Sequence, residues 1–168
     1  MSSIFKKTSY RFLELIPLFL LFFISLNGNS IIDLNYFSIN IHYIYVYYWV
    51  LKRPQILGYG FIFLSGIIAD VIFGLPIGLN SLVLLVIASF ATYIRVVTVR
   101  INLISDWLGF IPVLIIANIS HFIILYLLNY PIEYFNFFVN SIFTFISYPI
   151  LWAIFELFIN ITNINLHD

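Results

Sequence analysis

The sequence contains no cysteine and few charged residues, and these two shortages exclude several classes of protein. Without cysteine, the chain has neither a disulfide framework nor a thiolate metal site. Its three histidines, His42, His121 and His167, are far apart in the sequence and lack the spacing of paired metal ligands. Phosphate-binding glycine loops and nucleophile elbows are also missing. We therefore expect no enzyme activity, no cofactor and no nucleic-acid partner.

What the chain has in abundance is apolar side chains. Of its 168 residues, 63% are hydrophobic and 8% are charged. A soluble domain has about 45–50% apolar and about 25% charged residues. One water-soluble core could not bury so many apolar side chains. The composition therefore predicts an all-α integral membrane protein, with one domain over residues 1–168.

Glycine, proline and polar residues divide the chain into about six predicted transmembrane helices in one compact bundle. These helices lie near residues 10–27, 36–51, 56–74, 78–95, 104–128 and 134–160. The first segment begins like a signal peptide, but it has no clear cleavage site near 26–28, so we interpret it as a retained helix. The second segment alternates in places like a β-strand, but a lone strand would leave backbone groups unpaired in lipid. We expect a helix there, with a tilted or partly re-entrant helix as an alternative.

The basic residues predict the orientation of this bundle. The connections near 28–35, 75–77 and 129–133 contain no lysine or arginine. All the basic residues fall on the other side of a six-helix bundle: Lys6, Lys7, Arg11, Lys52, Arg53, Arg95 and Arg100. Because basic loops stay in the cytoplasm, both termini are predicted to be cytoplasmic.

One carboxylate, Asp70, lies inside an apolar run. Gly66, Asp70 and Gly74 recur at steps of four residues and therefore share one helix face, where small residues let another backbone approach closely. Two interpretations stay open: a hydrogen-bonded acid that ties the helix end, which we favour, or a functional intramembrane charge. Under the first interpretation, Asp70→Asn should be tolerated, because an amide retains donor and acceptor groups.

The segment "GLPIGLN" follows Asp70 and predicts a short, stiff turn on the outer side. Gly74 can end one helix, Pro76 cannot continue it, and Gly78 can begin the next. The candidate partners of Asp70 are Asn80 and Ser81, which open that next helix, and the polar residues of the last helix, which are expected at the same depth.

Other polar residues are spaced along the last two helices. Asn136, Asn140, Thr144, Ser147 and Tyr148 form a stripe that predicts hydrogen bonds between helices, with a water-filled substrate cavity as the alternative. Asn118 and His121 are interpreted as satisfied interior groups and not as a proton relay.

Charged residues near the inner helix ends have simple expected roles. Glu14 and Glu156 are expected to pair with Arg11, Lys52 or Arg53, or to reach the interface. Asp106, at the start of the fifth helix, suits the positive end of the helix dipole.

A long stretch of the chain resembles a known family. The stretch is "YYWVLKRPQILGYGFIFLSGIIADVIFGLPIGLNSLVLLVIASFATYI", and a second is "YPIEYFNFFVNSIFTFISYPILWAIFELF". They resemble the rod-shape-determining membrane protein MreD family. The features that carry the resemblance are Trp49, Arg53-Pro54, Gly66, Asp70, Gly74, Gly78, Asn140 and Pro149.

This resemblance implies a non-enzymatic scaffold of the bacterial cell-elongation machinery, located in the inner (cell) membrane. It implies an MreC-like periplasmic protein, an MreB-like filament and a RodA–transpeptidase peptidoglycan synthase as partners. The family is also similar in fold to the S components of energy-coupling-factor vitamin transporters. That similarity supplies an alternative function, the binding of a small molecule among the helices.

Overall fold

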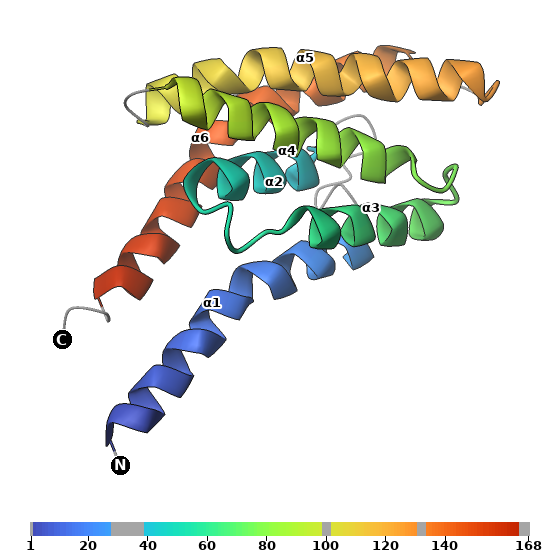
Figure 1. The fold of residues 1–168 in the computed structure, drawn as a ribbon. Helices are drawn as coiled ribbons and strands as arrows, with labels where there is room; N and C mark the ends of the chain where they lie inside the picture. Colours follow the sequence, from blue (N-terminus) through green and yellow to red (C-terminus); the bar gives the residue numbers. More distant parts are fainter. Residues whose placement is uncertain (1, 28–38, 99–101, 131–133, 165–168) are drawn as a thin grey trace.

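The computed structural model is a bundle of α-helices (Figure 1). It describes residues 2–27, 39–98, 102–130 and 134–164, and within these the side chains of 15–27, 39–98, 102–130 and 135–160. The described residues contain no strand, and the predicted all-helical class is confirmed. The helices are α1 (Ser2–Asn27), α2 (Ile41–Lys52), α3 (Tyr59–Phe73), α4 (Leu79–Val97), α5 (Leu103–Leu127) and α6 (Tyr134–Ile164).

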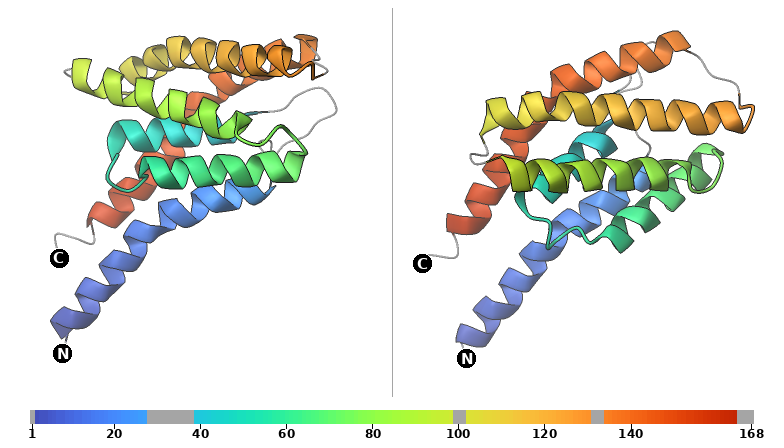
Figure 2. Two further views of the ribbon diagram at one scale, coloured as in Figure 1. Left: turned by 45° about the vertical axis from the view of Figure 1, so that its right-hand side comes forward. Right: turned by 45° about the horizontal axis from the view of Figure 1, so that its top comes forward.

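Helix α2 lies at the centre of the bundle. It contacts α1, α4 and α6, while α1 packs on α3, α3 on α4, α4 on α5, and α5 on α6. The five outer helices therefore follow one another around α2. Figure 2 shows this arrangement from two further sides, and in both views the first turn of α1 and the last turn of α6 lie at the same end of the bundle.

The second predicted span differs most from the structure. It is helical, as expected, but α2 begins at Ile41 and has only 12 residues. That length corresponds to about 18 Å, short of the roughly 30 Å of a bilayer core. The later start has a local cause, because Asn40 precedes the helix and its side chain accepts a hydrogen bond from the Tyr43 N–H at 3.3 Å. Every residue from Ile41 to Leu51 is buried, so α2 is an internal helix enclosed by the others.

Other helix ends shift by several residues. Helix α1 begins at Ser2, before the expected residue 10, and α6 continues to Ile164, beyond residue 160. Helix α3 begins at Tyr59, after residue 56, because Gly58 is the residue that caps it. The segment before it forms a turn closed by the Ile56 N–H on the Arg53 carbonyl at 3.1 Å.

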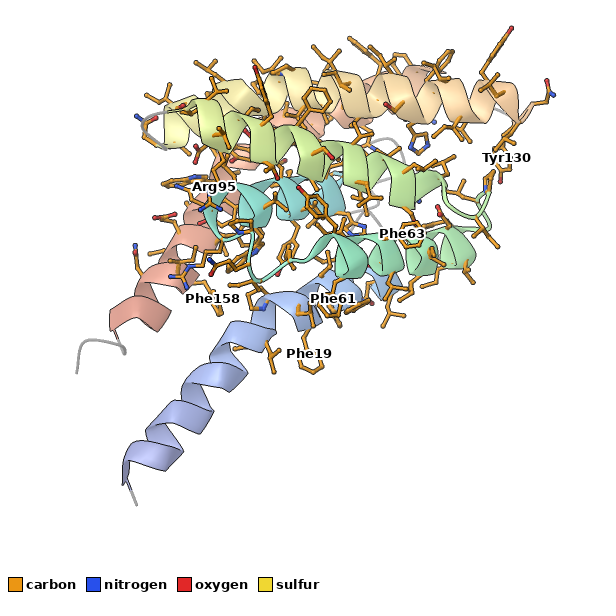
Figure 3. The ribbon with its side chains drawn as sticks, viewed as in Figure 1. Phe19, Phe61, Phe63, Arg95, Tyr130 and Phe158 are labelled. Carbon is orange, nitrogen blue, oxygen red and sulfur yellow. The ribbon has the colours of Figure 1, made fainter. Side chains whose placement is uncertain are left out.

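The outer faces have the composition of a surface in lipid. Three described helical segments are long and apolar enough to cross a bilayer, namely Leu79–Val97, Leu103–Leu127 and Phe135–Asn160. Leu15–Asn27 and Tyr59–Phe73 are apolar but shorter. Large hydrophobic side chains point outward from all five outer helices, as Phe19 does in Figure 3. The chain therefore has the character of a helical membrane protein.

Aromatic rings from three helices fill the interior around α2. Tyr47 contacts Phe110 of α5 and Tyr148 of α6, with ring centroids 5.0 and 5.7 Å apart. Nearer α1, Tyr45 meets Phe155 of α6 edge to face at 5.4 Å. The tyrosines and tryptophan that make α2 resemble a strand in sequence are thus packing groups of a central helix.

Candidate functional site

The turn between α3 and α4 is built around Asp70. Its side chain is fully buried, and its two carboxylate oxygens accept hydrogen bonds from the N–H groups of Gly78 at 2.8 Å and Asn80 at 2.9 Å. Gly78 and Asn80 lie at the N-terminus of α4, where backbone N–H groups have no partner within the helix. A carboxylate there also interacts favourably with the helix dipole. Asp70 therefore ties the end of α3 to the start of α4, which favours the structural interpretation of this residue.

The glycines of the turn adopt the conformations that the sequence suggests. Gly74 ends α3 with a φ of +63°, and Gly78 precedes α4 with a φ of +97°. Both angles lie in the left-handed region that favours glycine. Pro76 lies between them, and its carbonyl accepts the Leu79 N–H at 3.1 Å. The connection is therefore a tight turn, as expected.

Gly66 lies where the backbones of α3 and α4 touch. A Cβ atom at this position would lie 2.5 Å from the Ser81 backbone nitrogen, so no side chain fits without moving a helix. The Ser81 hydroxyl also donates a hydrogen bond to the Phe63 carbonyl at 2.9 Å. Together with Asp70, these contacts lock α3 and α4 into one hairpin, which we call the α3–α4 clamp (Gly66, Asp70, Gly74, Gly78 and Ser81).

A small polar chamber lies between α2, α5 and α6. Its volume is about 140 Å³, and Asn40, Asn118, His121, Asn140 and Thr144 are among its lining residues. The polar stripe of α6 contributes to this chamber and does not supply the hydrogen bonds of Asp70 described above. Pockets for small ligands have volumes of about 300–1,000 Å³, so the chamber is small for an organic ligand.

Hydrogen bonds across this chamber join the three helices. The Asn40 N–H donates to the Thr144 hydroxyl at 2.9 Å. The Asn118 amide donates to the Ser141 hydroxyl at 2.8 Å. The Tyr43 hydroxyl lies 3.3 Å from His121 Nδ1, so this histidine has a partner, as expected. These contacts favour the packing interpretation of the stripe.

An apolar groove of about 510 Å³ adjoins the chamber between α5 and α6. The groove and the chamber share four lining residues, namely Leu114, Asn118, Phe137 and Ser141. Elsewhere its walls are aliphatic and aromatic, as in Ile115 and Phe138, which are largely exposed on the outer surface. The groove therefore lies on a face with the apolar character of a lipid-exposed surface.

Charged residues meet at the opposite end of α2 from the chamber. The Lys52 ammonium lies 3.3 Å from Asp106 of α5 and 3.9 Å from Glu156 of α6. Trp152 donates to Asp106 at 3.0 Å, and Tyr48 donates to Glu156 at 2.8 Å. This ion-pair network joins α2, α5 and α6.

The sequence suggested Lys52 as one of three partners for Glu156, and in the structure these two charged groups lie 3.9 Å apart. The sequence did not predict the pairing of Lys52 with Asp106. For Asp106 it suggested only a favourable interaction with the helix dipole. The pairing could have been suspected from the expected position of the two residues in the membrane, because both lie at the basic ends of their predicted helices. Glu14 and Arg11 lie outside the described side chains.

The described acidic side chains at the two ends of the bundle have structural partners. The Asp70 oxygens accept backbone N–H groups, and the acids near Lys52 are engaged by lysine, tyrosine and tryptophan. No group of three histidine, cysteine or acidic side chains in the described part of the chain could hold a metal ion. Of the sites described above, the α3–α4 clamp is therefore the one that the sequence indicates most clearly. Comparisons with known protein families, with characterised proteins and with solved structures find no match to this chain.

Proposed function

We propose that the chain is a non-enzymatic membrane component of the bacterial rod-shape complex, of the MreD type. In this role it links an MreC-like protein and a RodA–transpeptidase synthase to an MreB-like filament. Its chain passes through the inner membrane in six helical segments, of which α2 is enclosed by the others and too short to span a bilayer core by itself. The fold is similar to that of S components, and both termini are in the cytoplasm.

The observation that carries this proposal is the position of the residues behind the resemblance. Gly66, Asp70, Gly74 and Gly78 lie together in the α3–α4 clamp, where they determine how two helices pack. A motif that determines helix packing supports a shared fold and does not require the protein to catalyse a reaction. It fits a scaffold whose partners contact its helices.

The distribution of charge supports the proposed orientation. Lys52 and Arg53 lie at the end of α2 and Arg95 in the last turn of α4, and all three line one cleft, so the C-terminal ends of these two helices lie at one end of the bundle. The α3–α4 turn joins the other ends of its two helices and carries no basic residue. This alternation is the pattern of the positive-inside rule. The turn is short, so partners would contact the protein mainly through its lipid-facing sides.

Depletion of the protein in its host tests the proposal directly. We expect rod-shaped cells to become round and an MreC-like protein to lose its localisation. Expression of the wild-type chain should restore both. Unchanged cell shape and unchanged localisation after depletion would contradict the proposal.

The polar chamber supports a second candidate, a small-molecule-binding protein of the S-component type. Asn118, His121 and Asn140 could contact a ligand there, but the volume of about 140 Å³ suits one smaller than a vitamin. Mass spectrometry of the purified protein distinguishes the two functions. A stoichiometric metabolite would favour the second candidate, whereas a co-purified MreC-like protein without a metabolite would favour the scaffold.

A further inference from the structure

The cleft lined by Lys52, Arg53 and Arg95 has a volume of about 480 Å³ and opens at the end of the bundle where the described basic residues gather. Lys52 and Arg53 contribute from the end of α2, and Arg95 from the last turn of α4. Leu15 of α1 and Phe61 of α3 line it as well, and Figure 3 labels Phe61 and Arg95. The cleft is distinct from the α3–α4 clamp and from the polar chamber, and the proposed function assigns it no ligand.

The charge on this cleft is positive. None of the described residues that line it is acidic. The positive charge of Lys52 is paired with Asp106 and Glu156 in the ion-pair network. Arg53 adds a second cation to the lining, and Arg95, a third, is an exposed residue. Guanidinium groups bind phosphate oxygens through paired, charge-assisted hydrogen bonds.

The remaining wall of the cleft is apolar. Leu15 and Phe61 are both exposed large hydrophobic residues, on two helices that pack against each other. Next to them, Phe19 extends the apolar surface of α1 (Figure 3). A free phosphate ion would gain nothing from these side chains. An amphiphile with a phosphate at its polar end would contact both walls at once.

We propose that this cleft binds the phosphate headgroup of an anionic phospholipid, with Arg53 and Arg95 at the phosphate and Leu15 and Phe61 against the first carbons of the acyl chains. Basic pockets between membrane helices are suited to anionic headgroups of this kind. The ligand class is therefore phosphatidylglycerol and related anionic lipids.

Native mass spectrometry of the full chain in detergent tests this site, with titrations of phosphatidylglycerol, phosphatidylcholine and inorganic phosphate. We expect phosphatidylglycerol to bind more tightly than phosphatidylcholine. Inorganic phosphate should not compete at equal concentration. Arg95→Gln should weaken phosphatidylglycerol binding about fivefold, and a second change, Arg53→Gln, should weaken it by a similar factor.

Two control variants keep the test independent of folding. Arg95→Lys keeps the charge and should retain most of the affinity. Tyr93→Gln changes an exposed residue of α4 that does not line the cleft, and it should leave the affinity unchanged. Equal binding of the two lipids by the wild-type chain would overturn the proposal. So would wild-type affinity in the double glutamine variant, or inorganic phosphate binding as tightly as phosphatidylglycerol.

Discussion

Replacement of Asp70 separates a structural acid from a functional charge. Asp70→Leu removes both acceptors of the Gly78 and Asn80 N–H groups, of which the second is buried and the first partly buried. An unsatisfied buried group costs about 1–3 kcal/mol, so the two together cost about 2–6 kcal/mol. Folded domains are stable by about 5–15 kcal/mol, so this loss should sharply reduce the amount of folded protein.

The geometry changes the expectation for asparagine. Both carboxylate oxygens of Asp70 accept N–H groups, whereas an amide has only one oxygen, and its nitrogen would face a second donor. Asp70→Asn should therefore lose one of the two hydrogen bonds. We expect it to cost about 1–3 kcal/mol, intermediate between wild type and Asp70→Leu.

The free energy of unfolding in detergent and the abundance in membranes measure these changes. Val71→Leu is a matched control, because Val71 is 64% exposed on the outer surface next to Asp70. It should behave as wild type. A wild-type unfolding free energy for Asp70→Leu would refute the capping role. Normal abundance of Asp70→Asn with lost rescue of cell shape would show that the charge itself is used.

Three further predictions follow from the packing and the charges. Gly66→Ala should lower the melting temperature, because its Cβ would meet the α4 backbone. Gly60→Ala is the control and should not lower it, since a Cβ there has no described neighbour within 4 Å outside its own helix backbone. Equal melting temperatures for the two variants would contradict the close contact. Lys52→Met should destabilise the fold by about 3–5 kcal/mol, because Asp106 is 2% exposed and would lose its cation. Adding Asp106→Asn should recover part of that loss. If unfolding experiments show no recovery in the double variant, the pairing is contradicted. In this cysteine-free chain, Ile77→Cys should react with an impermeant maleimide from outside intact cells, since Ile77 is exposed in the α3–α4 turn; labelling only after lysis would reverse the proposed orientation.

The sequence by itself determined the class of the protein and the local features of its chain. The excess of apolar residues predicts a membrane protein, and helix breaks at glycine, proline and polar residues predict six helices, all of which are present. The α3–α4 turn was also predictable, because left-handed glycines and a proline act within a few residues of themselves. Asn80 and Ser81 were expected beside Asp70 for the same reason, and both belong to that hairpin.

Only the tertiary structure decided which helix lies inside. The sequence marked α2 as an unusual, partly strand-like span but not as an internal helix, because hydropathy reports the apolar character of a side chain and not whether protein or lipid covers it. Its central place depends on five other helices packing around it. The pairing of Lys52 with Asp106, the polar chamber and the basic cleft likewise join residues from distant segments. Such contacts depend on how the helices rotate and approach one another, and a pattern within one helix does not contain that information.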